Sequence, residues 1–494
     1  MADDQPTDIL CIIPSRLGVG QKFQLKMKVL GPVHPLEPAG GWCDLKPNLH
    51  SCFNLNVPRQ IHYMDNCLPE WEGRLEVEAD GALDGPSEII FDGESQGVYP
   101  GDKRPIKVVE EFQWNEPGFH FLRLTDPDSG LSVSTNAVYV TEADPQWHIY
   151  WGDPHWQTYF SDGIRCPEEL YSFARDEAFL DFGAMADHVE AVTDRQWDYF
   201  QAVTNDYNEP DRFATLIGQE WTHHEPSRGA PGHRNIYYPG SGGPVLRSTD
   251  PQCDTLEKLW ACLDQLDEAL AIPHHSANSV MGVDWSQGWN PRYEKAVEIY
   301  SVWGNSEKPA EDGNPRPMAP ENLGGEQAGQ HVIDALKRGY RFGFVGGGDI
   351  HDGRPGDALH DEAYPDRPYT IHDQGLTACL APRLSRHNVY DAIKTHHTYA
   401  TTLSRIYLQV ASAGDGSGDL KVKAASEEGL SRVVMALNGE EPEAVEPDGD
   451  GRTIETTLSP GQLRGDEFCY VRVETQKGNM AWSSPVWGED RKGC

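Results

Sequence analysis

The sequence predicts a mixed α/β protein in which a central α/β domain lies between two β-rich regions. Period-two alternation of apolar and polar residues marks strands within residues 1–146. Short apolar strands then alternate with amphipathic helices through residues 147–402, and β character returns over residues 403–494. These three features predict the fold class and the domain boundaries together.

The first region, residues 1–146, is expected to form a β-sandwich-like domain. Phe23, Leu25 and Met27 alternate with Gln24 and Lys26, which is typical of a half-buried strand. A similar alternation follows at residues 75–79, and proline- and glycine-rich segments separate the runs. A sandwich buries the apolar faces of such strands against each other.

The middle region, residues 147–402, is expected to form an α/β layer or barrel. Proline is tolerated in the first turn of a helix, so Pro167 is expected to open one. Asp194 is expected to cap a second helix, and Thr255 to begin a third. Strands are expected at residues 214–218, 270–273, 296–300 and 342–345. In a fold built this way, the active site lies at the carboxyl ends of the strands.

Histidine and carboxylate side chains follow several of these predicted strands. A lone histidine is more often a satisfied surface group than a ligand, but repetition after separate strands argues for a common site. Imidazole and carboxylate ligands suit zinc, manganese or iron. A glutamate among them can bridge two ions held ~3.5–4 Å apart, as two-metal hydrolases require. The residues concerned are Asp153, His155, Asp187, His188, Glu220, His233, His274, His275, Asp349 and His351.

The order of these motifs resembles the PHP superfamily, named for polymerase and histidinol phosphatase domains. Its usual motifs are Asp-Leu-His-x-His-Thr, Thr-Asp-His and Asp-x-His. Here they read Asp153-Pro-His155-Trp-Gln157-Thr158, Ala186-Asp187-His188 and Asp349-Ile-His351. The match covers roughly residues 150–402. Within the superfamily, the chain looks closest to a bacterial family known mainly as a domain of unknown function.

The resemblance implies a distorted (β/α)7 barrel with up to three metal ions at its mouth. It assigns His155, Glu220 and Asp349 to one ion, with Glu220 bridging to a second. It assigns His233 and His274 to that second ion. A third ion would be held by His188 and His351, with Asp162 as a further candidate ligand. The expected cofactors are therefore two or three divalent ions of zinc, manganese or iron.

The chain departs from the family pattern at two positions. Gln157 stands where the second histidine of the opening motif is expected, and an amide oxygen is a weaker ligand than imidazole. Gly163 stands near the place where many members supply another histidine. Because of these changes, two ions are at least as well supported as three.

Three further residues are predicted to act in catalysis. His275 is expected to contact substrate or carry a proton, with its neighbour His274 as the ligand. Asp187 is expected to act as a base or as an acceptor for a ligating histidine. Arg354 is expected either to clamp a phosphate oxyanion or to form a salt bridge within its loop.

Three functional hypotheses follow from these residues. The first is a metal-dependent hydrolase that acts on a small phosphoester, in which the phosphorus rests on family analogy alone. The second keeps the hydrolase but changes the bond to a carboxylic or sulfate ester, a lactone or an amide. The third is a binding module whose site has decayed, which the departures at Gln157 and Gly163 motivate.

Composition limits the partners and the compartment. The 494 residues include 41 basic and 78 acidic side chains, for a net charge of −37. Such a field repels nucleic acid and anionic membranes, although a salt-rich habitat also favours an acidic surface. No secretory signal or membrane-spanning run is visible, and the ten cysteines show no paired spacing. We therefore expect a cytoplasmic protein with a small-molecule ester substrate, whose flanking β regions form pocket walls or a homo-oligomer interface.

Overall fold

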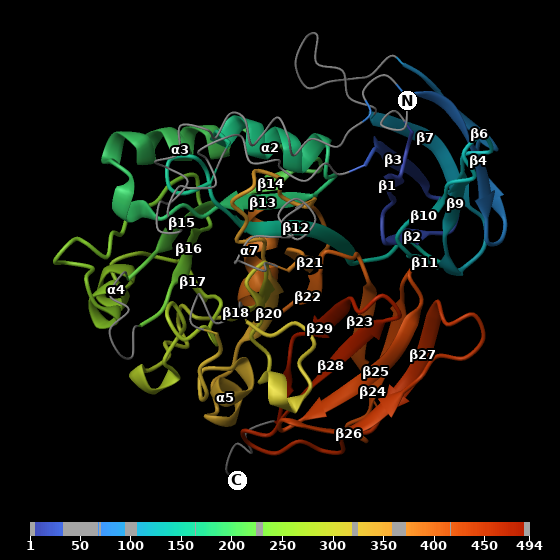
Figure 1. The fold of residues 1–494 in the computed structure, drawn as a ribbon. Coiled ribbons are helices and arrows are strands. Elements are labelled where there is room, and N and C mark those ends of the chain that lie inside the picture. The colour runs from blue at the N-terminus through green and yellow to red at the C-terminus, as the bar shows by residue number, and fades with distance from the viewer. Residues whose placement is uncertain are drawn as a thin grey trace.

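The structure, a computed structural model, describes residues 5–32, 68, 71–93, 106–163, 165–223, 231–318, 325–357, 372–414 and 416–488. The fold is mixed α/β with more strand than helix (Figure 1). Among the described residues, every helix is too short or too polar to cross a lipid bilayer.

The N-terminal region is built from strands packed around a core of its own. β3 carries the predicted alternation, with Phe23, Leu25 and Met27 buried and Gln24 exposed, so this predicted strand is confirmed. The sheets run in the orders β1-β3-β7-β5, β10-β9-β4-β6 and β2-β11-β8. The strands are β1 (Asp8–Ile12), β2 (Arg16–Gly18), β3 (Lys22–Leu30), β4 (Glu72–Ala79), β5 (Leu83–Asp84), β6 (Glu88–Asp92), β7 (Ile106–Trp114), β8 (Gly118–His120), β9 (Leu122–Thr125), β10 (Ser132–Ser134) and β11 (Val138–Thr141).

The central region contains the helices. The strands are β12 (His148–Trp156), β13 (Phe182–Met185), β14 (Ala214–Thr215), β15 (Ile217–Trp221), β16 (Arg234–Tyr238), β17 (Leu270–Pro273), β18 (Ala296–Ser301), β19 (Gly304–Asn305), β20 (Gly343–Gly346), β21 (Gly375–Ala381) and β22 (Thr398–Thr402). The α-helices are α2 (Pro167–Asp176), α3 (Asp194–Asp206), α4 (Leu256–Leu263), α5 (Val332–Lys337) and α7 (Arg386–Lys394).

The helix starts follow the local capping chemistry. α2 opens on Pro167, and the hydroxyl of Thr255 caps α4 by accepting the backbone N–H of Lys258, as expected. The predicted cap of α3 is wrong by one residue. Thr193 accepts the backbone N–H of Gln196, which makes Asp194 the first helical residue.

The strand directions differ from a regular alternation of strand and helix. β12, β13 and β14 are parallel, and so are β18 and β20. β16, however, pairs antiparallel with both β15 and β17. β21 likewise runs antiparallel to β12. The described pairings therefore form mixed sheets, and they do not show seven consecutive βα units.

The antiparallel course of β16 still brings functional residues to a single edge. The amino end of β16 lies beside the carboxyl end of β15, because Arg234 pairs with Trp221. It also lies beside the carboxyl end of β17, because Arg234 pairs with Pro273. Two isolated parallel bridges join further strand ends at this edge. One pairs His188 with Glu220, and the other pairs Trp156 with Ile350.

The C-terminal strands continue the central sheet. β22 pairs with β29, so one ten-stranded sheet crosses the predicted boundary at residue 402, and the domain division itself stays a prediction. The strands are β23 (Tyr407–Ser412), β24 (Leu420–Ala425), β25 (Leu430–Leu437), β26 (Glu440–Val445), β27 (Thr453–Leu458), β28 (Phe468–Thr475), β29 (Met480–Ser483) and β30 (Val486–Trp487). The apolar run that contains Val471 and Val473 lies in β28, as expected.

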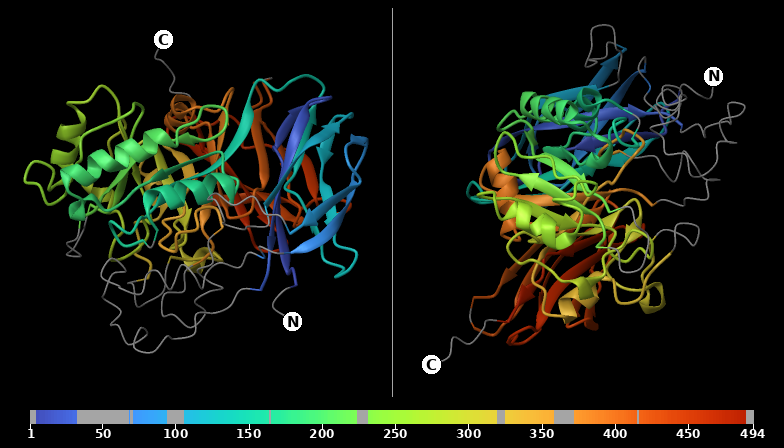
Figure 2. Two further views of the ribbon diagram at one scale, coloured as in Figure 1. Left: turned by 90° about the horizontal axis from the view of Figure 1, so that it is seen from above. Right: turned by 90° about the vertical axis from the view of Figure 1, so that its left-hand side faces the viewer.

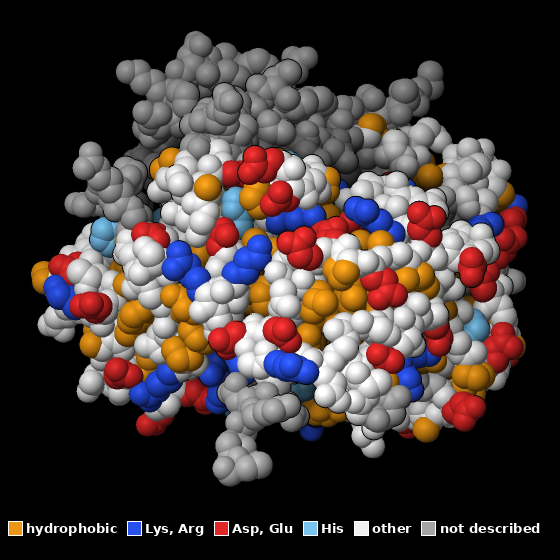
Figure 3. Space-filling view, turned by 90° about the horizontal axis from the view of Figure 1, so that it is seen from below, with side chains coloured by type: hydrophobic (Ala, Val, Ile, Leu, Met, Phe, Trp, Pro, Cys, Tyr) orange, Lys and Arg blue, Asp and Glu red, His pale blue; other side chains and the backbone are white. Residues whose placement is uncertain are grey.

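The N-terminal and C-terminal β regions lie next to each other on one side of the molecule (Figure 2). Lys423 of β24 donates to the hydroxyl of Tyr139 in β11 at 2.7 Å, and Phe119 packs edge-on against Tyr407. Acidic, basic and hydrophobic side chains are interspersed over the face shown in Figure 3.

Candidate metal centre

Three groups of histidine and carboxylate side chains meet at the shared edge of the central strands. In each group, the potential ligand atoms lie within 4.8 Å of one another. Most of these residues stand at or just after a strand end, and His233 immediately precedes the antiparallel β16. The groups are Glu220, His233, His274 and His275; His155, His274 and Asp349; and Asp162, His188 and His351.

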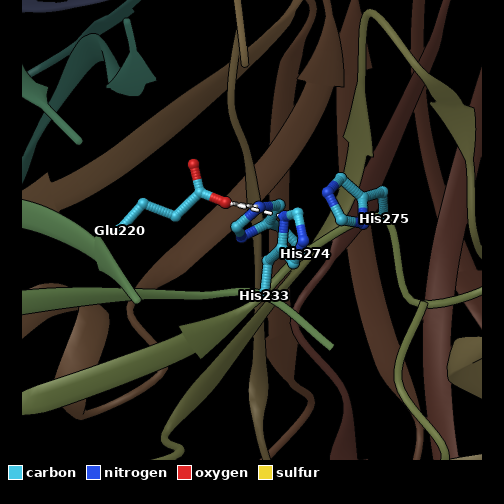
Figure 4. Close-up of side chains that lie close together, drawn as sticks. All are labelled: Glu220, His233, His274 and His275. Carbon is cyan, nitrogen blue, oxygen red and sulfur yellow. Dashed lines mark hydrogen bonds and ion pairs between the residues drawn. The ribbon is translucent and has the colours of Figure 1, made fainter. Parts of the chain in front are cut away.

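Glu220 occupies the middle of this arrangement. Its Oε1 lies 2.8 Å from His233 Nδ1 and 3.1 Å from His274 Nε2. Its Oε2 lies 3.1 Å from His188 Nδ1 and 3.7 Å from His155 Nε2. Figure 4 shows the carboxylate pointing toward His233 and His274, with His275 on the far side of them. One carboxylate therefore faces histidines from four different strand ends.

His155 is held between two carboxylates. Its Nε2 lies 3.2 Å from Asp349 Oδ1, and its Nδ1 lies 3.1 Å from Glu298 Oε2. Glu298 projects from the middle of β18, and all three side chains are buried. A carboxylate on the second nitrogen of a histidine is the usual way in which a metal ligand is oriented.

The group of Asp162, His188 and His351 is the most open of the three. Asp162 Oδ1 lies 3.2 Å from His351 Nε2 and 3.7 Å from His188 Nε2. These side chains keep between 14% and 20% of their surface exposed, whereas those of His155 and His274 are fully buried. This group therefore forms the side of the centre from which solvent and small molecules can approach.

Backbone strain and close packing coincide with the centre. His275 and Asp349 adopt positive φ values of 34° and 48°, a region that side chains other than glycine rarely occupy. Any side chain at Gly347 would meet the carboxylate of Glu298, and one at Gly348 would meet that of Asp153. Gly347 and Gly348 are thus required by the carboxylates packed against them.

The histidines of the centre experience opposite electrostatic environments. Burial lowers the pKa of His233 to about 4 and, together with the neighbouring His274, holds the pKa of His275 well below its ordinary value. Burial also opposes the charged form of His351, but Asp162 raises its pKa to about 9. Because their pKa values are lowered, His233 and His275 are neutral at neutral pH. Neutral imidazole is the form that binds a metal.

The charge of Glu220 is stabilised from several sides. Burial alone would raise the pKa of its carboxyl, but the surrounding histidines hold that pKa well below the ordinary value. The hydroxyl of Thr222 also donates to Glu220 Oε1 at 3.0 Å. Glu220 is therefore ionised and able to bridge cations.

The structure places Gln157 beside Glu220 but turns its amide oxygen elsewhere. The amide nitrogen donates to Glu220 Oε2 at 2.7 Å, and the amide oxygen lies 2.8 Å from the Ser161 hydroxyl oxygen. Oxygen is the amide atom that binds cations. Metal ligation by Gln157 thus stays a prediction that requires a different amide orientation.

Asp187 lies next to the centre without joining any of the three groups. Its Oδ1 accepts the backbone N–H of Thr158 and the hydroxyls of Thr158 and Ser161, at 2.7–2.9 Å. Burial raises the pKa of Asp187 to about 6, against the effect of these hydrogen bonds. The contacts show that Asp187 fixes the loop after β12, and its predicted role as a base stays a prediction.

Arg354 is not brought to the three groups. Its guanidinium pairs with the carboxylate of Asp357 at 2.5 Å and lies over the ring of Phe173. Of the two alternatives drawn from the sequence, the described contacts match the loop salt bridge.

No role was predicted from the sequence for two acidic residues beside the centre, Glu298 and Asp153. Glu298 contacts His155 as described above. Asp153 accepts the backbone N–H groups of His155 and Gly348 at 2.9 and 2.7 Å, and burial raises its pKa to about 8. Glu298 had a visible signal, since it is a charged residue inside the apolar run of β18. Asp153 was quoted in the opening motif without a role.

Comparison with known proteins identifies relatives whose activity is unknown. A family model described as a protein of unknown function, DUF3604, matches residues 167–307. Uncharacterised proteins of Chlamydia muridarum and Chlamydia trachomatis are each 28% identical over 411 and 410 residues, respectively. The matches cover 77% of this chain, which spans only 63% of the length of each relative.

One solved structure shows a distant likeness. It is titled as a two-domain protein from Bacteroides vulgatus that contains a predicted PHP-like metal-dependent phosphoesterase. The identity is 16%, and the match covers 67% of this chain and 88% of that one. Its TM-score of 0.33 is too low to establish a common fold.

Proposed function

We propose that this chain is a metal-dependent hydrolase with a centre of two or three divalent ions. The observation that carries the proposal is the ionised Glu220 carboxylate, surrounded by histidines from four strand ends and flanked by three groups of ligand atoms. We further propose that these strand ends form the mouth of a distorted barrel of the PHP type.

The residues present fit metal ions. Within the described residues, His274 Nδ1 and His275 Nδ1 are buried ring nitrogens without a hydrogen-bond partner, while His155 Nε2 and His233 Nδ1 face carboxylate oxygens at 3.2 and 2.8 Å. Buried polar atoms are nearly always paired, so the two unpartnered nitrogens beside these carboxylates point to a partner of another kind. Imidazole nitrogens converging with carboxylates match zinc, manganese or iron.

Each group of the centre has a task in this proposal. Bound divalent ions supply Lewis-acid activation of water and offset negative charge on the attacked group. Glu220 would hold neighbouring ions, and Glu298 fixes the ring of His155. His275 is neutral and buried with an unpartnered Nδ1, so we assign it to substrate contact or proton transfer.

The bond that is hydrolysed is proposed to be a phosphoester, on the basis of the motif resemblance. A neutral ester is the second candidate, and one observation favours it. The chain has a net charge of −37, and the guanidinium of Arg354 is engaged by Asp357. A neutral substrate would meet less electrostatic repulsion in such an acidic protein than an anionic one would.

Metal analysis combined with a substrate screen tests the proposal. Protein purified without chelator is analysed for zinc, manganese and iron, and assayed with chromogenic phosphate monoesters, phosphate diesters and carboxylic esters. Two or three equivalents of metal with chelator-sensitive phosphoester turnover support the first candidate. Turnover of carboxylic esters alone supports the second. Less than one equivalent, not restored by added metal, with no turnover, would overturn the hydrolase.

A further inference from the structure

We propose that Lys28 of the N-terminal β region is a positioning residue for the segment that carries Asp349 and His351. The proposal rests on the metal-binding role of those two residues proposed above. It gives the N-terminal β region a function that the sequence does not reveal, because Lys28 lies 329 residues away from its partner Asp357.

Lys28 is a fully buried cation at the junction of two regions. It lies in β3, and its Nζ donates to Asp357 Oδ2 at 2.7 Å and lies 3.9 Å from Glu177 Oε2. The ammonium also lies 4.7 Å from the ring centre of Phe173 in α2. Burying an ammonium group is costly, so these partners must hold it closely. Figures 1 and 2 show the N-terminal strands beside the central region.

Asp357 closes the segment that follows His351. Arg354 pairs with the Asp357 carboxylate, and its Nε donates to the Asp357 carbonyl oxygen at 2.8 Å. The backbone N–H of Arg354 donates to Asp352 Oδ1 at 2.9 Å. Residues 352–357 therefore form a compact turn, which Lys28 holds from outside through Asp357.

The same turn is tied to the centre from the opposite side. The backbone N–H of Gly356 donates to Gln374 Oε1 at 2.9 Å, and Gln374 donates to Asp153 Oδ2 at 3.1 Å. Asp153 in turn holds the backbone N–H groups of His155 and Gly348. A continuous set of contacts thus runs from Lys28 to the backbone on both sides of the ligands.

Phe173 provides the shared surface for the cations of this network. Arg165 and Arg354 lie 4.9 and 5.1 Å from its ring centre, in addition to Lys28. Cations over an aromatic face are stabilised when they are withdrawn from water. The network has little freedom to rearrange, which is what a precisely held ligand requires.

The test compares Lys28→Met and Lys28→Arg with the wild-type protein. Lys22→Met is the matched control, because Lys22 lies on the same strand but is exposed. Metal-free protein is titrated with Co²⁺, and hydrogen exchange is followed in residues 349–357. Loss of a positioning partner typically weakens metal binding about 10- to 100-fold. We expect Lys28→Met to weaken the binding of one metal ion by that factor and to speed amide hydrogen exchange in residues 349–357. Lys28→Arg should recover most of the metal affinity. Lys22→Met should match the wild type in both measurements.

A second background separates positioning from general destabilisation. In a protein that carries both Asp349→Ala and His351→Ala, Lys28→Met should cause no further loss of metal affinity, because its effect passes through these two ligands of the segment. An equal loss in both backgrounds, or wild-type affinity and exchange in a folded Lys28→Met protein, would overturn the proposal. If Lys28→Met does not fold, Asp357→Asn weakens the same contact and should give the results expected of Lys28→Met. A wild-type protein that binds no metal refutes the proposed function, whereas the exchange comparison still tests the contact of Lys28.

Discussion

Glu220 is the residue on which the candidate centre depends most. It faces His155, His188, His233 and His274, and its carboxylate is ionised although it is buried. A charge in such a position is stable only while its partners are cationic groups or metal ions.

Glu220→Gln keeps the shape of this side chain but removes its charge. We expect the variant to lose at least one equivalent of metal and to lower any hydrolytic turnover by about 100-fold or more, because a bridging ligand is gone. Metal analysis and the ester assays measure this. Glu257→Gln, at an exposed position of α4, is the control and should keep full metal content. Full metal content in Glu220→Gln would contradict the bridging role.

The raised pKa of Glu427 predicts how the free energy of unfolding depends on pH. Burial, helped by the neighbouring Glu428, raises the pKa of Glu427 to about 7, and its Oε2 has no hydrogen-bond partner among the described residues. Because the folded pKa lies above the unfolded value, the folded state binds the additional proton between about pH 4.5 and 7. Stability from this group is present at low pH and is lost as the pH rises through that window.

Glu427→Gln should therefore stabilise the protein at pH 8 relative to the wild type, by about 3 kcal/mol, with little difference at pH 4.5. Urea denaturation of both proteins at the two pH values measures the free energies of unfolding. A stabilisation of equal size at both values would show that the ionisation of Glu427 is not its source.

At the scale of elements, the centre depends on strands that contribute no ligand of their own. β18 carries Glu298, which lies 3.1 Å from His155 Nδ1 and blocks any side chain at Gly347. β18 is also parallel to β20, the strand that leads to Asp349. One strand thus orients His155 and supports the start of the Asp349 segment.

Glu298→Gln should lower metal affinity about 10- to 100-fold without unfolding the protein. The amide retains the volume of the carboxylate but binds the ring of His155 less strongly. Co²⁺ titration measures the affinity, and circular dichroism checks the fold. Glu111→Gln, an exposed position in β7, should bind metal as the wild type does. Unchanged metal affinity in Glu298→Gln would show that Glu298 of β18 does not orient His155 for metal binding.

At the scale of the whole molecule, buried charges join the C-terminal strands to the central region. Glu307 accepts from Tyr470 and Arg472 at 2.7 Å and from Trp482 at 2.8 Å. The side chains of Arg472 and Glu307 are only 3% and 2% exposed. The C-terminal strands are therefore joined to the central region both by these buried contacts and by the shared sheet.

Removing one partner of a buried ion pair leaves the other charge uncompensated. Arg472→Ala should therefore reduce the free energy of unfolding by about 3–5 kcal/mol. Arg432→Ala removes a pair with Glu474 in which the arginine is 44% exposed, and it should cost less than about 1 kcal/mol. Guanidinium denaturation measures both. A similar cost for the two variants would show that the buried pair does not join the regions.

Much of the candidate centre could be predicted from the sequence. His155, His188, Glu220, His274 and Asp349 were all expected at strand ends, and the structure brings them together. Strand ends are visible in a sequence because apolar runs stop where polar groups begin. The direction of β16 could not be predicted, because it depends on the pairing of β16 with β15 and β17, whereas a burial pattern shows only which faces of a strand are covered.

The orientation of polar side chains could not be predicted from the sequence either. Gln157 was expected to offer its oxygen, and Arg354 to face either a substrate or its own loop, from motif position alone. Their actual contacts, with Glu220 and with Asp357, depend on which residues surround them in space. Glu220 lies 63 residues from Gln157 in the sequence. Asp357 lies only three residues from Arg354, but its contact with Lys28 spans 329 residues.

By itself, the sequence determined the chemistry that this protein can offer: histidines and carboxylates, spaced by strands and helices whose periodicity follows from local backbone geometry. Only the tertiary structure decided which of them share a cation site, that Glu220 lies at the centre, and that Lys28 reaches the Asp357 turn. The reason is physical. Periodicity and capping depend on neighbours along the chain, whereas ligand geometry and buried charge pairing depend on neighbours across it.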